Sequence, residues 1–244
     1  MKKSTLYIGM RKIFYLLTDS RCVLCQKPLS FENKFYNSLC EKCFKIFTVE
    51  KSEFFCKKCG DALNTNGFCS KCSIDSKSVN YDSFRYIQSY SGAAMQLVKL
   101  HKQQDNHKVI DLYVSFLCSV LNPDYPVYIV PDSFFRRIKK GKCCFSVEIT
   151  RKLRKKGFRV FFGIIKKSSW AKMQKLLNHK DRKKNAEKSF HLNKKCHLQI
   201  DSDYIQLVDD IFTTGSTINR CSKLLKDFGF KKVFAYSLFK AKFS

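Results

Sequence analysis

Long apolar runs are missing from this sequence. No stretch of 18 or more consecutive apolar residues occurs in its 244 residues, so we expect no transmembrane helix. The first part of the chain, from Met1 to Leu17, also lacks the long apolar h-region and the small-residue cleavage site of a secretory signal. We therefore expect a cytoplasmic protein.

Acidic residues are scarce. The chain has 20 Asp and Glu residues against 47 Lys and Arg residues, which gives a formal net charge of +27. Such an excess favours polyanionic partners: nucleic acid, phosphorylated ligands or an acidic surface. A lysine-biased composition is the alternative explanation, because Lys, Asn, Phe and Ile are all heavily used. The length is sufficient for one sizeable core and a small additional module.

Cysteine, by contrast, is abundant and unevenly distributed. Eight of the thirteen cysteines form four pairs with two residues between partners. In a reducing compartment such pairs hold metal far more often than they form disulfides, and eight thiolates make two tetrahedral sites that favour structural zinc. Redox activity is the alternative for any single pair, and both sequential and alternating pairing are open. The predicted ligands are Cys22, Cys25, Cys40, Cys43, Cys56, Cys59, Cys69 and Cys72.

A polar stretch of small residues at 73–83 is the predicted domain boundary. Before it we expect an amphipathic lead-in at 1–21 and a zinc-ribbon-like module at 22–75. The lysines and aromatic residues of that module either grip a single nucleic-acid strand or, as we favour, fill a minimal core that zinc supplements. From residue 84 to residue 244, strands alternate with helices, which predicts an α/β fold with a doubly wound, mainly parallel sheet. Expected strands are 84–90, 126–130, 158–165, 204–208 and 233–239; expected helices are 93–100, 109–121, 148–156 and 218–228.

The stretch from Tyr204 to Thr217 is the strongest candidate for a ligand site. An apolar strand leads into Asp209 and Asp210, then into a loop of small residues, then into a helix. Backbone N–H groups at a helix start attract phosphate, and two acids at the carboxyl end of a strand can accept hydrogen bonds from ribose hydroxyls. An ordinary strand-to-helix turn is the alternative. The predicted phosphate loop consists of Thr213, Thr214, Gly215, Ser216 and Thr217.

This stretch resembles the PRPP-binding motif of type I phosphoribosyltransferases, in which two acids hold the ribose and the next loop holds the 5-phosphate. It is not a Walker loop, because no Gly-Lys-Ser/Thr follows the glycine. Two further elements extend the likeness. One is the segment from Gln174 to Asn185 together with the later Phe190, and the other is Val98-Lys99-Leu100. With the four cysteine pairs, the layout from residue 22 to about residue 240 is similar to that of the ComF (ComF/GntX) family.

The resemblance implies PRPP with Mg²⁺ as ligand and a role linked to bacterial DNA uptake, with single-stranded DNA and proteins of an uptake system as partners. Two loops depart from the family pattern. Pro131-Asp132-Ser133 stands where the family has Pro-Val-Pro, and Lys140 to Ser146 stands where it has Arg-Gly-Phe-Asn-Gln. Lys140 and Lys142 either screen a pyrophosphate as point charges or form a solvated basic loop.

Two functional classes remain open from the sequence. In one, the protein is a PRPP-dependent enzyme on an unknown acceptor, with Asp210 as the candidate acid or base. In the other, which we favour on the family resemblance, it handles nucleic acid in DNA uptake and its sugar-phosphate site is a regulatory or scaffold pocket. The basic segment 166–195 suits the second class, with Lys180, Arg182, Lys183 and Lys184 as the predicted contacts.

Overall fold

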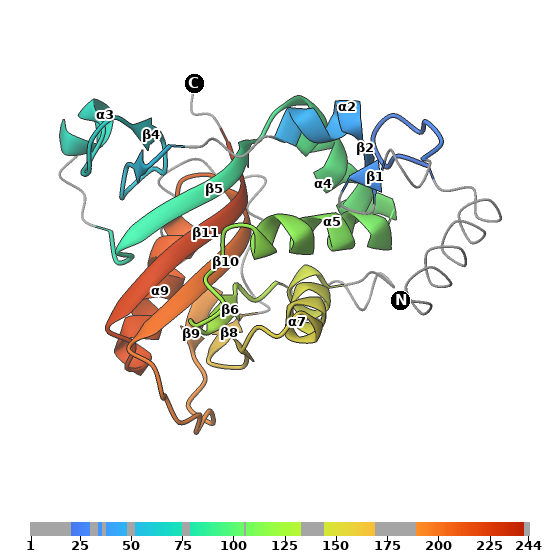
Figure 1. The fold of residues 1–244 in the computed structure, drawn as a ribbon. Helices are drawn as coiled ribbons and strands as arrows, with labels where there is room; N and C mark the ends of the chain where they lie inside the picture. Colours follow the sequence, from blue (N-terminus) through green and yellow to red (C-terminus); the bar gives the residue numbers. More distant parts are fainter. Residues whose placement is uncertain are drawn as a thin grey trace, which may run out of the picture. The chain divides into compact units, whose positions relative to one another are not determined.

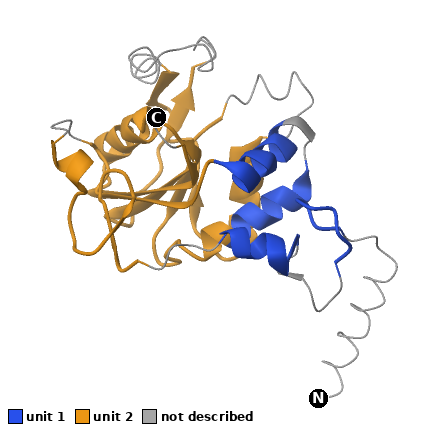
Figure 2. Ribbon diagram, turned by 90° about the horizontal axis from the view of Figure 1, so that it is seen from above, with its two compact units in different colours: residues 1–48, 91–115 blue, residues 49–90, 116–244 orange. Residues whose placement is uncertain are grey.

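The computed structural model describes residues 21–29, 34–35, 38–47, 52–74, 79–104, 106–132, 144–168 and 189–241. Contacts divide the chain into two compact units, residues 1–48 with 91–115 and residues 49–90 with 116–244 (Figure 2). Each unit thus joins part of the cysteine-rich region to part of the later chain. Apart from Arg21, the expected lead-in lies outside the described residues, and the domain division at 73–83 stays a prediction.

The first unit builds a small helical body around the first two cysteine pairs. Its hydrogen bonds join segments far apart in sequence: Ser38 Oγ donates to the Lys108 carbonyl at 3.1 Å, and Gln96 Nε2 donates to the Leu24 carbonyl at 3.1 Å. Leu97 is fully buried, as expected for an apolar helix face. The elements are β1 (Lys34–Phe35), β2 (Leu39–Cys40), α2 (Glu41–Phe44), the 3-10 helix η1 (Lys45–Phe47), α4 (Gly92–Gln104) and α5 (His107–Cys118), whose last residues belong to the second unit.

The second unit contains a five-stranded sheet in the order β5-β11-β10-β6-β7, and all of its neighbouring strands are parallel (Figure 1). The two strands made last in the chain therefore lie inside the sheet, and β5 and β7 are its edges. Apolar residues dominate β6, β10 and β11, as buried parallel strands require. The strands are β5 (Ser83–Ser89), β6 (Val127–Ile129), β7 (Val160–Phe161), β10 (Tyr204–Phe212) and β11 (Lys232–Lys240).

Helices flank this sheet. The helix α9 (Ser216–Phe228) lies behind it in Figure 1 and buries Ile218, Cys221 and Leu225 in one cluster with residues of β10 and β11. The helix α7 (Phe145–Lys155) packs against β6 and β7. The predicted α/β class with a zinc-ribbon region before a mainly parallel sheet is confirmed. Among the helices of the described residues, none combines the length and apolar character needed to cross a bilayer.

One predicted strand was wrong in extent. Residues 158–165 do not form a single strand, because Gly163 adopts φ +81° and turns the chain between β7 and β8 (Ile165–Lys167). Asn193 stabilises this turn, since its Nδ2 donates to the Gly163 carbonyl at 2.8 Å. The strand β8 then pairs antiparallel with β9 (Phe190–Leu192), a hairpin that the sequence pattern did not predict.

The second cysteine group lies within the second unit. A short antiparallel pair, β3 (Phe54–Phe55) with β4 (Ala62–Leu63), and the helix α3 (Ser70–Ile74) flank its ligands, of which Cys72 lies within α3. The other predicted elements agree with the structure within a few residues at each end. The strand β10 contains both acids near its carboxyl end and continues to Phe212.

Candidate functional site

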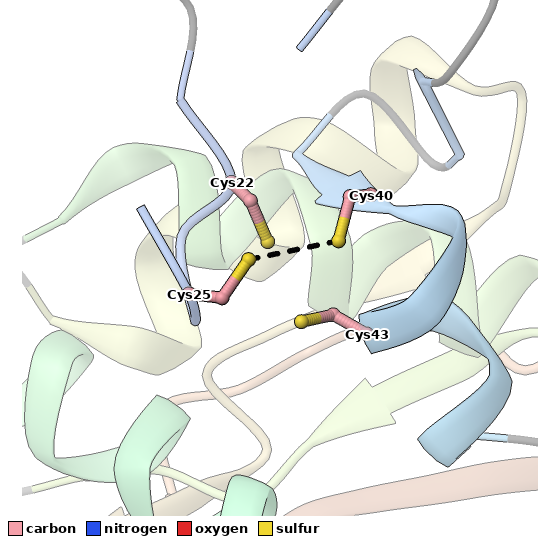
Figure 3. A group of neighbouring side chains, drawn as sticks. All are labelled: Cys22, Cys25, Cys40 and Cys43. Atoms are coloured by element: carbon pink, nitrogen blue, oxygen red, sulfur yellow. Dashed lines mark hydrogen bonds between the residues drawn. The ribbon is translucent and has the colours of Figure 1, made fainter. Parts of the chain in front are cut away.

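The first four-cysteine group joins two sequential pairs. Cys22, Cys25, Cys40 and Cys43 point toward one another (Figure 3), and their sulfur atoms all lie within 4.8 Å of one another. Burial raises the pKa of Cys22, but backbone hydrogen bonds, the largest at Cys25, outweigh it and bring the pKa to about 7. A thiol that ionises this readily is prepared for metal at neutral pH.

The second group repeats this arrangement with Cys56, Cys59, Cys69 and Cys72, whose sulfurs also lie within 4.8 Å of one another. Burial raises the pKa of Cys56, yet backbone hydrogen bonds, foremost from Cys69, bring it to about 7. The Cys69 N–H lies 3.3 Å from the Cys56 sulfur. Of the two pairings that the sequence left open, the structure has the sequential one, and both donor sets fit structural zinc.

The predicted ligand site lies where the strand order of the sheet reverses. From β6 the chain proceeds to β7 on one side, while β10 and β11 lie on the other side. The Val130 N–H donates to the Val208 carbonyl at 2.9 Å, so the chain after β6 runs beside the acidic end of β10. This juncture at the carboxyl ends of parallel strands is the usual position for ligands in open α/β sheets.

The two acids are half-buried near the end of β10. Asp209 Oδ1 accepts a hydrogen bond from the Asp210 N–H at 2.9 Å, and Asp210 Oδ1 accepts one from the Ile211 N–H at 2.8 Å. The Asp209 charge also reaches the thiol of Cys221 on α9. Burial first, and Asp209 second, raise the pKa of Cys221 well above its usual range, so this thiol stays protonated.

The predicted phosphate loop turns tightly into α9. Gly215 adopts φ +71°, and a Cβ there would lie only 2.8 Å from the Phe212 ring, so both the backbone and the space require glycine. The Thr214 and Ser216 hydroxyls lie 2.8 Å apart. The Asn219 N–H donates to the Gly215 carbonyl at 2.8 Å, which closes the first turn of the helix. The loop thus brings two hydroxyls and the positive end of α9 together.

Asp132, on the neighbouring loop after β6, is held by α7. The Ser146 hydroxyl donates to Asp132 Oδ1 at 2.8 Å. Pro131 precedes it directly and follows Val130, whose N–H is bonded to Val208 of β10. The other predicted loop residues, Lys140 and Lys142, lie outside the described residues. So do the predicted nucleic-acid contacts Lys180, Arg182, Lys183 and Lys184 and the segment from Gln174 to Asn185.

Two cations near the site were not assigned to it from the sequence, although Lys167 belongs to the basic segment 166–195. Arg220 on α9 donates to the Phe190 carbonyl through Nε at 3.2 Å and Nη2 at 3.0 Å. The Lys167 ammonium lies 5.0 Å from the centre of the Phe190 ring. Both cations oppose the effect of Asp209 on the Cys221 thiol. Only the hairpin of β8 and β9 brings Lys167 here, and that pairing left no clear signal in the sequence.

Comparisons with known proteins agree with this architecture. Residues 13–73 match a family model described as a double zinc ribbon domain. Competence protein F of Haemophilus influenzae is 28% identical over 235 residues, which cover 91% of this chain and 97% of that protein. Competence protein ComFC of Streptococcus pneumoniae is 25% identical over 236 residues, covering 89% of this chain and 99% of that protein. The double zinc ribbon and the two relatives matched along almost their whole length support the ComF family for this chain.

Proposed function

We propose that this protein binds PRPP together with Mg²⁺ at the carboxyl end of β10, and that it serves a competence-related role in handling incoming single-stranded DNA. The observation that carries the proposal is the loop 213–217. It follows a paired acidic strand end, lies where the strand order reverses, and opens a long helix. In this assignment Thr213, Thr214, Gly215, Ser216 and Thr217 hold the 5-phosphate through hydroxyls and backbone N–H groups.

The ribose is assigned to Asp209 and Asp210. Only two residues separate this pair of half-buried carboxylates from the phosphate loop, so a sugar whose 5-phosphate rests on that loop brings its hydroxyls toward them. Carboxylate and hydroxyl oxygens are also the ligands that Mg²⁺ prefers, alongside the oxygens of a pyrophosphate. The residues assigned to the ribose and those assigned to the 5-phosphate thus follow one another in the chain, at the carboxyl end of β10.

The pyrophosphate half is assigned to the loops that begin at Pro131 and Asp132 and include Lys140 and Lys142. A carboxylate at position 132 repels a pyrophosphate unless a cation lies between them, which makes binding at this half depend on Mg²⁺. Lys167 and Arg220 add positive charge on the side of β8 and α9. Without Mg²⁺, we expect these loops to bind pyrophosphate more weakly than a pyrophosphate loop rich in backbone N–H groups would.

The DNA-handling role is supported by the names of the two relatives, by the formal charge of +27 and by the basic residues Lys180, Arg182, Lys183 and Lys184. Binding through phosphate contacts does not depend on sequence and weakens steeply as salt rises. A cytoplasmic location agrees with a chain whose eight paired thiols serve as metal ligands, since such thiols persist in reducing compartments. Proteins of a DNA-uptake system are the expected partners.

An active PRPP-dependent phosphoribosyltransferase is the second candidate, with Asp210 as its acid or base. Displacement of pyrophosphate builds positive charge on the ribose, which a neighbouring carboxylate stabilises. The observation favouring this candidate is that Asp210 is only half-buried and is separated from the phosphate loop by just two residues. Release of pyrophosphate from PRPP in the presence of nucleobases or other nucleophiles would distinguish an enzyme from a binding protein.

The first experiment is a calorimetric titration of the zinc-loaded protein with PRPP and Mg²⁺. We expect binding by the wild type and its loss in Asp209→Asn/Asp210→Asn. The matched control is Asp201→Asn/Asp203→Asn, which removes the same charge from two exposed residues that pair with Arg159 and Lys231. No binding by a folded wild type, or equal losses in the two double variants, would refute the site.

A further inference from the structure

The two four-cysteine sites differ in what surrounds them. The first lies in a unit with α4 and α5, whereas the second lies in the same unit as the phosphate loop. Here the knuckle is the segment 56–61, which carries Cys56 and Cys59. We propose that metal at the second site, and not at the first, positions the phosphate loop 213–217, because the knuckle is packed against the groups that hold that loop.

The shortest connection is a line of close packing. Gly60 in the knuckle has φ +74°, and a Cβ there would lie 3.0 Å from the Phe84 ring and 3.1 Å from the Phe84 carbonyl. The Phe84 and Phe212 rings are stacked with their centres 4.1 Å apart. Phe212 in turn lies against Gly215, with room for no side chain between them. Three successive close-packed contacts therefore join the knuckle to the phosphate loop.

A second connection uses hydrogen bonds. The Tyr81 hydroxyl donates to the carbonyl of Lys58, inside the knuckle, at 2.7 Å. The preceding residue, Asn80, donates to Asn219 Oδ1 through its backbone N–H at 2.6 Å and through Nδ2 at 3.0 Å. Asn219 is the residue whose own N–H closes the first turn of α9 on Gly215. The start of the helix that would receive the phosphate is thus tied to the chain leaving the metal site.

A third connection is electrostatic. Asp61 accepts a hydrogen bond from the Cys59 thiol at 3.2 Å, from Lys240 Nζ at 2.5 Å and from the Tyr86 hydroxyl at 3.1 Å. Lys240, whose side chain is 12% exposed, ends β11 directly opposite Phe212. The Asp61–Lys240 ion pair therefore joins the end of the knuckle to the residue of β11 that lies opposite Phe212.

All three connections end at Phe212, Gly215 and Asn219, which define the shape of the phosphate loop. Residues 56–61 have little regular structure of their own, so metal ligation supplies their order. Linkage is reciprocal: if the metal favours the binding-competent loop, a ligand on the loop must tighten the metal at the second site by the same factor. The first site shares none of the contacts described above, and it therefore supplies a matched comparison.

The test compares Cys72→Ser with Cys40→Ser in the full-length protein. Each variant removes one half-buried ligand, and each is expected to retain one zinc of two. The readout is amide hydrogen exchange in a peptide spanning 213–220, which requires no sugar phosphate. We expect Cys72→Ser to speed this exchange by about tenfold, within the usual range of coupling between sites, and Cys40→Ser to leave it unchanged. Equal exchange in the two variants would overturn the proposal.

A third variant covers the case in which Cys72→Ser does not fold. Phe84→Leu keeps all eight thiols and both zinc ions but removes the ring stacked on Phe212. It is expected to speed exchange in the same peptide while zinc content stays at two. Unchanged exchange in Phe84→Leu would also overturn the proposal. The partner variant Leu97→Ala, in the core of the first unit, controls for a general loss of packing.

The reciprocal measurement depends on the proposed PRPP site. Zinc transfer to a colorimetric chelator is followed with and without PRPP and Mg²⁺, and PRPP is expected to slow the release of one zinc of two. If calorimetry shows that PRPP does not bind, the proposed function fails, while the exchange comparison still decides the positioning role. If PRPP binds and slows both zinc ions equally, or neither, the link to the second site is refuted.

Discussion

Substitution of Gly215 by alanine tests the geometry of the phosphate loop most directly. An L-residue at φ +71° is disfavoured by roughly 1–2 kcal/mol. The new methyl group would also lie 2.8 Å and 2.9 Å from two atoms of the Phe212 ring, and overpacking of this kind costs about 1–3 kcal/mol. We therefore expect Gly215→Ala to lower the free energy of unfolding by about 2–5 kcal/mol and to abolish PRPP binding.

Gly163→Ala is the matched control. Gly163 has φ +81°, but no atom lies within 4 Å of the position its Cβ would take. It should show only the backbone cost of about 1–2 kcal/mol, and any gain from a stiffer unfolded chain is common to both variants. The difference between the two free energies of unfolding, measured with urea by circular dichroism, then isolates the contact with Phe212.

A second change at the same place sharpens the test. Leucine lacks the outer ring atoms that the new methyl group would meet, so Gly215→Ala/Phe212→Leu should be more stable than the sum of the single changes predicts. The reasoning is refuted if Gly215→Ala and Gly163→Ala are equally stable, or if the double variant shows no such recovery. Normal PRPP binding by Gly215→Ala would refute the assignment of the loop.

Three further predictions concern the core, the metal sites and the thiols. The Gln206 side chain is fully buried and forms hydrogen bonds with the Asn122 N–H, the Asn122 carbonyl and the Tyr125 carbonyl. Gln206→Leu should therefore lower the free energy of unfolding, measured with urea, by about 1–3 kcal/mol. An unchanged urea midpoint would contradict this. The purified protein should carry two zinc ions by elemental analysis, and their removal with a chelator should lower its melting temperature; an unaltered melting curve would show that the metal is not structural. Cys221, whose pKa is raised by burial and then by Asp209, should be among the last thiols alkylated by iodoacetamide at pH 8, and early labelling in the folded protein would contradict its buried position.

The parts of this fold that could be predicted from sequence are those with a local cause. The spacing of the eight cysteines identified both metal sites, because two thiols on one turn suffice to mark a knuckle. The apolar strand, the acids and the small-residue loop of residues 204–217 marked the candidate ligand site, since backbone and side-chain requirements occur there in chain order. Gly215 was singled out for a positive φ or a close approach, and the structure gives it both.

The parts that were missed depend on contacts between distant segments. The break at Gly163 and the pairing of β8 with β9 are set by Asn193 and Phe190, which a window over 158–165 does not contain. The sequence pattern of α4 and α5 is that of ordinary helices covering a sheet. It did not predict that they form hydrogen bonds with Leu24 and Ser38. Likewise, the residues around Phe84 in the sequence do not predict that its ring stacks on Phe212.

The strand order has a consequence for how the chain folds as it is made. The interior strands β10 and β11 come last in the sequence, yet among the described strands β5 pairs with β11 alone and β6 needs β10 on one side. On the ribosome, β5 therefore has no partner until almost the whole chain has been synthesised, and pairing of such distant segments is slow. The cysteine groups need only the short segments 22–43 and 56–72, so zinc can order the amino-terminal region while its partner strands are still to come.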